Sequence, residues 1–390
     1  MSSGHVVYVG PFSFPSGGAA SRRILHNCLS LLEQGYRVSV ASGQNSDNSS
    51  VNNIEGIDVY SLNERNSEHL PRLLKHLSYF SMGKKTVAWL DSLEYKPKAV
   101  ILYSGYSPYL IQLIKWSKRN KVKLIFDAVE WYDPPSVISR LSPYYLNIEL
   151  AMRLLIPKVD GIISISSYLH DYYVDKGCQS LLMPPTTSEL NISNHYIYSD
   201  ACLKIAYAGS PGNKDLLNIV IDAVNSLVAL GHSIELNIAG LSKSGLEDYC
   251  VKYNVKNGIS DHIVAHGYLD FDESVELVST SDFSILVRPI KRYSTAGFST
   301  KFVESLVCGT PVIANITSDL GNYIRDNVNG IICQDYSLES VKEAIINAVN
   351  VKLEKEKYMS MRDRAKADGL CYFHYSKYSN NIDNFIQNLG

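Results

Sequence analysis

The stretch "AGFSTKFVESLVCGTPVIA" (296–314) carries the most specific structural pattern in the chain. A loop containing Gly297 leads into a short run with helical character at 300–308, which Gly309 ends. The apolar run "PVIA" (311–314) is typical of a buried strand. A helix that leads directly into a short buried strand is part of the repeating unit of an α/β fold, in which helices cover both faces of a parallel sheet.

The same alternation of strand and helix extends outward from this stretch in both directions. The N-terminal half has one clear helical run at 22–35, and its predicted strands lie at 5–10, 37–42, 98–104, 122–129, 161–166 and 179–184. In the C-terminal half, helices are predicted at 215–230, 244–254 and 300–308, and strands at 203–209, 234–240, 262–267, 282–287 and 311–314. The polar tract 43–53 is predicted to be a loop.

The alternation breaks once, in the polar segment "PPTTSELNISNHYIYSDA" (184–201) with its pair of prolines. This break predicts an α/β protein with two Rossmann-like domains, at 1–190 and 200–372, which face each other across a cleft. We expect a final helix at about 373–390 to pack back on the first domain. A ligand is expected in the cleft, at the carboxyl ends of the strands.

Composition excludes several classes of protein. The chain has 390 residues, of which 45% are hydrophobic and 19% charged, so it can bury a core and is not disordered. The net charge of −2 gives no sign of nucleic-acid binding. Residues 1–190 hold 19 basic against 16 acidic side chains, and residues 191–390 hold 18 against 23. The slightly basic first half could favour contact with an acidic surface such as lipid headgroups, although so small an excess is also typical of an ordinary, nearly neutral protein surface.

Cysteine usage and hydropathy suggest a cytoplasmic protein that could associate peripherally with the inner face of a membrane. The seven cysteines are scattered and never form C-x-x-C, which argues against disulfides or a zinc site. No apolar stretch approaches the roughly 20 residues of a spanning helix, and we expect no signal peptide before the first strand. The segment 69–90 is helical, aromatic and basic, as is typical of a membrane-surface helix, although an amphipathic core helix explains it equally.

Two glycine-containing loops lie between a strand and a helix, where free backbone N–H groups can hold phosphate. In "GPFSFPSGGAASRR" (10–23), Gly17 and Gly18 would let a diphosphate approach the main chain, while at least one of Arg22 and Arg23 is expected on a solvated face. In "YAGSPGNKD" (207–215), Lys214 stands near a helix start, which is unfavourable for a cation unless an anion binds there. The neighbouring Asp215 could also neutralise Lys214.

The opening stretch forms a third loop of this kind. The backbone N–H groups at 299–301 could hold phosphate, with Gly297, Phe298, Ser299, Thr300 and Lys301 as its residues. Glu304, one turn into the helix, could accept hydrogen bonds from both ribose hydroxyls or could simply pair with Lys301. Arg288 leaves the carboxyl end of a strand, where site residues are common.

A fourth motif is "LIFDAVEWYDPP" (124–135). Asp127 and Glu130 follow a strand, and either carboxylate could contact a sugar hydroxyl or a leaving group. Trp131 could pack on a sugar face or lie in the core. Asp270 in "DFD" is better explained as a helix cap than as a metal ligand, and no histidine spacing indicates a metal site.

Taken together, these motifs resemble the family 4 glycosyltransferases of the GT-B type over nearly the whole chain. The segments that carry the likeness are "SGGAASRRILHNCLSLLEQGYRVSVAS", "GIISISSYLHDYYVDKG", "KIAYAGSPGNKD" and "GFSTKFVESLVCGTPVIANITSDLGNYIRDNVNGII". The resemblance implies transfer of a sugar from a nucleotide-sugar donor, with retention at the anomeric carbon and no metal. It implies that Glu304 is the ribose-binding second glutamate of the E-x7-E motif, Lys214 the diphosphate lysine and Gly18 the N-domain glycine.

Three positions depart from that family pattern. Ala296 replaces the first glutamate, which contacts the donor sugar. Ser210 and Pro211 stand where an arginine follows the glycine, and "VEW" replaces a frequent histidine after the 122–129 strand. Sequences with an S-x-T-K-type loop are a known variant of the motif, so "FSTKFVE" still implies nucleotide binding.

The resemblance leads to a retaining glycosyltransferase that uses a UDP- or GDP-sugar as substrate and needs no further cofactor. Glu130, Lys214 and Glu304 are its predicted catalytic residues, and Asp127 and Trp131 its predicted acceptor contacts. The expected acceptor is a glycan or a lipid-linked molecule of a bacterial surface polysaccharide. Two alternatives stay open: a non-catalytic GT-B binding partner and a sugar-nucleotide epimerase of similar fold.

Overall fold

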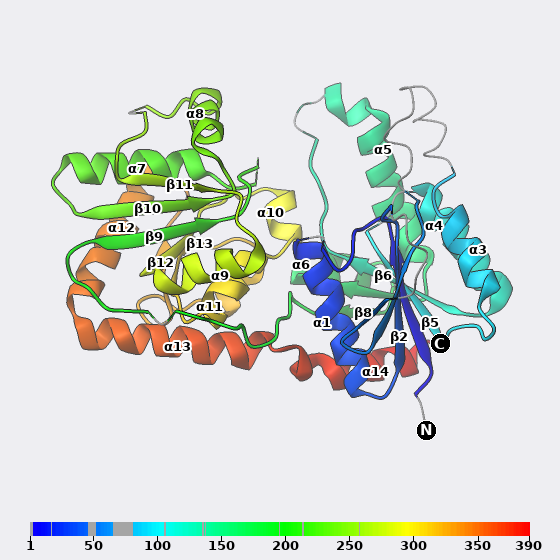
Figure 1. The fold of residues 1–390 in the computed structure, drawn as a ribbon. Helices are drawn as coiled ribbons and strands as arrows, with labels where there is room; N and C mark the ends of the chain where they lie inside the picture. Colours follow the sequence, from blue (N-terminus) through cyan, green and yellow to red (C-terminus); the bar gives the residue numbers. More distant parts are fainter. Residues whose placement is uncertain are drawn as a thin grey trace. The chain divides into compact units, whose positions relative to one another are not determined.

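The computed structural model describes residues 3–16, 18–45, 52–64, 81–104, 107–134, 136, 138–194, 196–212, 214–256 and 258–390. The chain divides into two compact units, one of residues 1–187 with 375–390 and the other of residues 188–374 (Figure 1). The sequence predicted two Rossmann-like α/β domains, and the fold confirms this class. The predicted domain break lay between residues 190 and 200, a few residues after the first unit ends.

The first unit is built on an eight-stranded sheet in the order β3-β4-β2-β1-β5-β6-β7-β8. Only the β3–β4 pair is antiparallel. Its strands are β1 (His5–Gly10), β2 (Arg37–Ser42), β3 (Asn52–Ile54), β4 (Ile57–Ser61), β5 (Ala99–Tyr103), β6 (Lys123–Ala128), β7 (Gly161–Ser164) and β8 (Ser180–Leu182). The central strands are apolar along their length because helices cover both faces, as in other parallel sheets.

Helices pack on both faces of this sheet. They are α1 (Ala19–Glu33), α3 (Lys84–Ser92), α4 (Ser107–Asn120), α5 (Pro143–Leu150), α6 (Ser167–Val174) and α14 (Ser379–Asn388), with the short turns η1 (Ile138–Leu141), η2 (Ala151–Leu155), η3 (Ile156–Lys158) and η5 (Tyr375–Tyr378). The C-terminal helix α14 contacts α1, and its Ile382 and Ile386 join the core of this unit.

The second unit has a six-stranded parallel sheet in the order β11-β10-β9-β12-β13-β14. Its strands are β9 (Leu203–Ala208), β10 (Ile234–Ala239), β11 (Ile263–Gly267), β12 (Phe283–Leu286), β13 (Val312–Asn315) and β14 (Gly330–Cys333). Its helices are α7 (Leu217–Ala229), α8 (Lys243–Lys252), α9 (Phe271–Thr280), α10 (Arg292–Ala296), α11 (Thr300–Val307), α12 (Leu338–Leu353) and α13 (Lys355–Phe373), and η4 (Ser318–Asn322) is a short turn. Asp270 caps α9 with a complete capping box, as the sequence predicted.

The structure adds elements that the sequence pattern did not predict. The tract 43–53, predicted to be a loop, ends in the edge strand β3, which pairs with a second unpredicted strand, β4. Of the predicted membrane-surface helix at 69–90, residues 69–80 lie outside the described part of the chain, and the remainder contains most of α3. Among the described helices, none is long and apolar enough to cross a bilayer.

Candidate functional site

In the second unit, Asp215 is the centre of a buried charge cluster at the carboxyl end of the sheet. Its carboxylate accepts hydrogen bonds from Arg288 Nε at 2.7 Å, Lys301 Nζ at 2.6 Å and the Tyr207 hydroxyl at 2.7 Å. The three partners come from β9, the end of β12 and the first turn of α11. One aspartate therefore binds two cations, and the cluster carries a net charge of +1.

Burial and charge both shift the pKa values of this cluster. Burial alone would raise the pKa of Asp215, but the adjacent Arg288 and Lys301 outweigh it and hold that pKa well below its usual range. The pKa of Lys301 is lowered, because burial and the nearby Arg288 charge together outweigh the opposite effect of Asp215. Burial, and then the Asp215 charge, raise the pKa of Tyr207 well above its ordinary value, so its hydroxyl keeps the proton that it donates.

The Lys301 side chain packs against the backbone of Gly209, where there is no room for a Cβ. A Cβ on Gly209 would lie 2.6 Å from Lys301 Cε, and the residue has φ +128°, which a side chain disfavours. The Lys301 ammonium lies 4.0 Å from the centre of the Tyr207 ring. Gly240 lets a second loop approach, because a Cβ there would come within 2.5 Å of the Gly209 carbonyl carbon. The "YAG" loop is therefore packed directly beneath a cation.

The N-terminus of α11 points to an anion at the same place. Ser299 is the N-cap residue and is only 2% exposed, yet its hydroxyl makes no capping bond, and its Oγ has no partner in the described structure. The first turn of α11 contains no acidic residue. The terminal nitrogens of Arg288 likewise have no hydrogen-bond partner among the described residues, since only its Nε and backbone groups are engaged. These donors can all be satisfied by an oxyanion.

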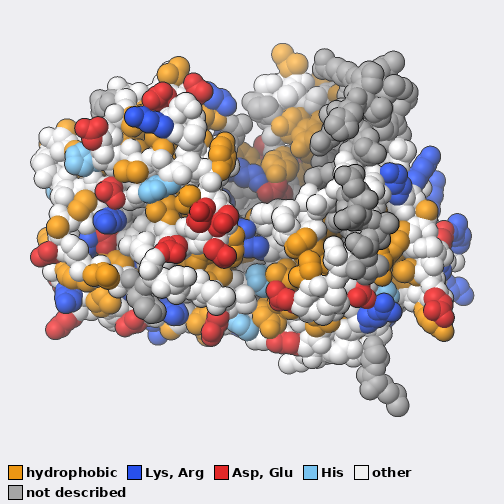
Figure 2. Space-filling model, in the orientation of Figure 1, with side chains coloured by type: hydrophobic (Ala, Val, Ile, Leu, Met, Phe, Trp, Pro, Cys, Tyr) orange, Lys and Arg blue, Asp and Glu red, His pale blue; other side chains and the backbone are white. Residues whose placement is uncertain are grey.

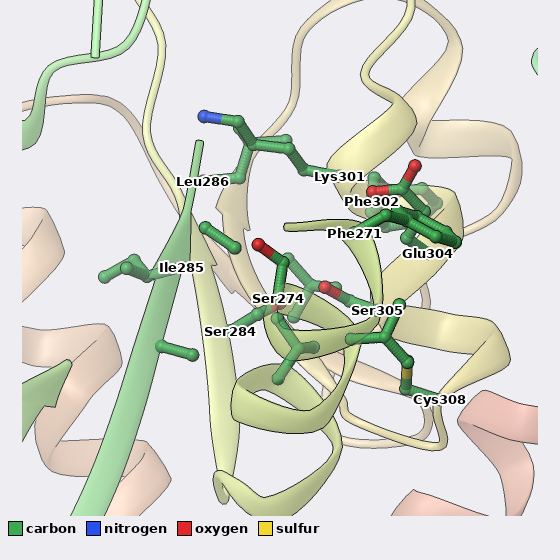
Figure 3. Close-up of a pocket in the computed structure, with 15 residues that line it drawn as sticks. Phe271, Ser274, Ser284, Ile285, Leu286, Lys301, Phe302, Glu304, Ser305 and Cys308 are labelled. Carbon is green, nitrogen blue, oxygen red and sulfur yellow. The ribbon is translucent and has the colours of Figure 1, made fainter. Parts of the chain in front are cut away.

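The carboxylate of Glu304 lies one turn further along α11. Glu304, Lys301, Ser274, Ser305 and Cys308 help to line a small pocket between α9, α11 and the sheet (Figure 3). The Lys301 ammonium and the Glu304 carboxylate point away from each other (Figure 3), and Lys301 binds Asp215. The pairing of Glu304 with Lys301 that the sequence left open is therefore not formed.

Other predicted donor residues surround this cluster in different ways. Ser210 is exposed beside Gly209, and Lys214 is half-buried next to Asp215, two residues before the N-cap of α7. Gly297 ends α10, and Thr300 begins α11. Asp215 binds Arg288 and Lys301 rather than serving only as a local neutraliser of Lys214.

Phe298, a residue of the predicted phosphate-binding loop, turns its side chain into the core of the second unit. Its ring packs against Phe302, Tyr323 and Phe373 in the core of the second unit. Ala296 is fully buried as well. Phe298 can therefore contribute to the predicted phosphate-binding loop only through its backbone.

The first unit has a separate pocket of about 390 Å³ at the carboxyl ends of β5 and β6. Glu130 lies in the wall of this pocket. The pKa of Tyr103 is raised mainly by burial and then by the Asp127 charge, and the Glu130 charge adds a smaller effect in the same direction. Ala19 and Ala20 bring the N-terminus of α1 to this pocket. Gly18 is the N-cap of that helix, with φ 66°, which explains glycine there. Gly17 lies outside the described residues.

The two predicted acceptor contacts in this unit, Asp127 and Trp131, are both buried. Asp127 is fully buried, and its carboxylate is held by Arg23 at 2.8 Å and by the hydroxyl of Tyr8 at 3.2 Å. Trp131 is 1% exposed and donates its indole N–H to Glu149. Asp127 borders the pocket that also contains Glu130, but its carboxylate is engaged by Arg23, and Trp131 belongs to the core, so burial argues against direct contact of either side chain with an acceptor.

At least one of the two arginines of α1 was expected on a solvated face, and Arg23 is not that arginine. It is 2% exposed, and it donates to Asp127 and to the carbonyl groups of Met183 and Pro184. Arg22 is half-buried. A signal for the buried pair was present, since Arg23 and Asn27 are four residues apart on the apolar face of a helix, and both contact Asp127.

The comparisons with known proteins agree with the two-unit fold. Residues 18–183 match the family model described as glycosyl transferase 4-like domain, and residues 203–368 match glycosyl transferases group 1. Each match falls within one of the two units. The chain belongs to the GT-B glycosyltransferases.

Similar proteins have been solved with the same fold. This GT-B glycosyltransferase superposes on the sucrose-phosphate synthase of Thermosynechococcus elongatus with a TM-score of 0.75 and 14% identity, covering 99% of this chain and 98% of that one. It superposes on Anabaena HepE in complex with UDP-glucose with a TM-score of 0.64 and 14% identity, covering 99% and 100%.

A curated relative also carries the glycosyltransferase name. An uncharacterized glycosyltransferase of Methanocaldococcus jannaschii is 29% identical to this GT-B glycosyltransferase over 134 residues. That match spans 34% of each chain, so it covers about a third of the relative's length.

Proposed function

We propose that this protein transfers a sugar from a nucleotide-sugar donor to a hydroxyl group of an acceptor, with retention of configuration at the anomeric carbon. The observation that carries the proposal is the set of unsatisfied donors around Asp215: the buried Ser299 hydroxyl, the Arg288 terminal nitrogens and the α11 N-terminus. A nucleoside diphosphate supplies the oxyanion that these groups lack. The UDP-glucose in Anabaena HepE, a protein of the same fold, supports this class of ligand.

In the proposed reaction, Arg288 and Lys301 stabilise the negative charge that develops on the diphosphate as it leaves. Lys214 lies next to Asp215 in the chain and is assigned the same role by its likeness to the family lysine. Glu304 accepts hydrogen bonds from the ribose hydroxyls. The cations perform the electrostatic task that a divalent metal performs in other transferases, so EDTA should leave turnover unchanged.

The bond between the anomeric carbon and the phosphate oxygen breaks, and a bond to the acceptor oxygen forms on the same face of the sugar. The acceptor proton passes to an oxygen of the departing phosphate, so the products are the glycoside and the protonated nucleoside diphosphate. Glu130, in the pocket of the first unit, is proposed to orient the acceptor hydroxyl. The proposed acceptor is a glycan or lipid-linked intermediate of a bacterial surface polysaccharide.

The first experiment is a thermal-shift panel of UDP, GDP and their sugars on the wild type and on Glu304→Ala. A ligand at 100 times its dissociation constant adds about 2.7 kcal/mol of stability. A shift with one nucleotide that Glu304→Ala weakens supports the site and names the base. No shift with any nucleotide contradicts the proposal and favours a binding partner without a donor site.

Turnover then separates the remaining alternatives. A transferase consumes its donor productively only when an acceptor is present, whereas an epimerase converts the donor without one. Proton NMR of the product gives the anomeric configuration, and inversion would contradict the retaining mechanism.

A further inference from the structure

The segment from η1 to η2 in the first unit exposes an unusual number of large apolar side chains. We call this set the α5 stripe; it consists of Ile138, Leu141, Tyr144, Leu146, Leu150 and Leu154, which are 84%, 76%, 49%, 52%, 41% and 58% exposed. In Figure 2, orange side chains gather over the part of the first unit where Figure 1 places α5. Soluble proteins scatter such residues singly, so six within 17 residues call for a partner.

Helix α5 carries apolar residues on every side, with Asn147 and Glu149 between them, yet none of its residues is buried. On one side, Tyr144 and Ile148 line the pocket that also contains Glu130. On the exposed side, Leu146, Leu150 and Leu154 repeat every four residues and so form one ridge along α5 and η2. A helix that is apolar all round is normally covered by protein or by lipid.

The charges around the stripe favour lipid over protein as the partner. Between Ile138 and Lys158 the chain has three cations, Arg140, Arg153 and Lys158, all exposed, and one acid, Glu149. Glu149 and Arg153 form an ion pair at 2.5 Å, and the Trp131 indole also donates to Glu149 at 3.0 Å. The positive charge of the segment is therefore carried by Arg140 and Lys158. The ridge is therefore bordered by positive charge, which anionic lipid headgroups complement.

We infer that the α5 stripe docks this protein on the surface of an anionic lipid bilayer, with the leucine ridge in the acyl boundary and the cations among the headgroups. This surface differs from the 69–90 segment that the sequence suggested. The pocket that shares Tyr144 with the stripe would then lie at the bilayer surface, within reach of a lipid-linked acceptor. That last link to an acceptor rests on the proposed function, whereas the docking itself does not.

The test is flotation of the full chain with vesicles of phosphatidylcholine containing 30% phosphatidylglycerol, without donor or acceptor. Leu150→Ser/Leu154→Ser removes two ridge residues that are exposed, so its fold should be kept; thermal unfolding checks this. The matched control is Leu230→Ser/Leu353→Ser, which removes two leucines that are 72% and 61% exposed on the second unit. We expect the ridge variant to lose at least about tenfold in vesicle partitioning and the control variant to match the wild type.

The ionic part is tested separately. Arg140→Gln, and salt at 0.5 M with the wild type, should each weaken flotation, and vesicles of phosphatidylcholine alone should bind less. Wild-type protein that stays unbound, or a ridge variant that floats like the control, overturns the proposal. A wild-type dimer in solution that the ridge variant abolishes would also overturn it, because the stripe would then join two copies. UDP binding in the same preparations reports independently on the donor site.

Discussion

Replacing Asp215 by asparagine should make the protein less stable and its affinity for a nucleoside diphosphate higher. The aspartate is 6% exposed and binds the side chains of Arg288 and Lys301, which are 12% and 24% exposed. Removing one partner of a buried ion pair costs about 3–5 kcal/mol, and the partial exposure of the two cations places this case near the lower value. For a unit of this size, about 3 kcal/mol corresponds to a decrease in Tm of roughly 6–12 °C.

Two opposing effects decide the affinity. The Asp215 charge repels an anion about 6 Å away by about 3 kcal/mol at an effective dielectric of 20. Losing the carboxylate also frees the Arg288 side chain, which then costs about 0.5–1.5 kcal/mol to order again on binding. Lys301 stays ordered in the variant because it also donates to the Tyr207 hydroxyl at 2.9 Å. The first effect is then larger, so the net gain of roughly 1.5–2.5 kcal/mol should tighten UDP binding about tenfold or more.

The assay is isothermal titration with UDP, together with thermal unfolding with and without UDP. The matched control is Asp282→Asn, which breaks the buried Asp282–Lys352 pair, whose atoms are 2.5 Å apart, in the same unit. Both variants should lose stability, but only Asp215→Asn should gain UDP affinity. If the two variants bind UDP as the wild type does, the cluster is a purely structural ion pair, and the reasoning is refuted.

Three further predictions concern the same site. Ser299→Ala should leave the free energy of unfolding nearly unchanged, because the Ser299 hydroxyl has no partner among the described residues. It should weaken UDP binding about tenfold, the loss expected for one hydrogen bond to a charged group. An equal loss of affinity in Thr295→Ala would contradict this prediction. Gly209→Ala should displace Lys301 and reduce donor affinity more than Gly231→Ala does, since Gly231 also has positive φ but an open surrounding. Because burial lowers the pKa of Lys301, UDP affinity should decline with rising pH at a lower pH than an ordinary lysine would cause. Lys301→Arg should shift that decline to higher pH, and identical pH profiles of the two proteins would refute the prediction.

The fold could be predicted from the sequence because strands that are buried on both faces are nearly continuous apolar runs. The strands β1, β2 and β10 lie within a residue of the predicted ranges for this reason. The pair β3–β4 was missed because β3 is a three-residue edge strand of sequence Asn-Asn-Ile, which has no apolar alternation. Helix α1 begins at Ala19, three residues before the predicted start, since alanine and serine precede its first apolar residue.

The candidate site was predictable only in part, because sequence spacing does not tell which way a side chain at a strand end points. Arg288, Lys301 and Ser299 meet at one edge because each follows a parallel strand or begins a helix there. Asp127 also lies at the carboxyl end of a parallel strand, yet it is buried, because Arg23 and Asn27 of α1 hydrogen-bond to it. Asp215 was read only as a neighbour of Lys214, because its true partners are 73 and 86 residues away.

The structure also accounts for how a cationic site persists without the arginine that the resembled family carries after the glycine of "YAG". Ser210 and Pro211 occupy that position, but Lys301 reaches across Gly209 from α11, and Arg288 joins it through Asp215. The positive charge beside the glycine is thus supplied by the opening stretch itself and by β12. Ala296, the last residue of α10, is fully buried, so a glutamate there would need its surroundings to repack before it could reach a donor. Under the proposed function, the variant motif is therefore a rearranged anion site rather than a site that has lost its chemistry.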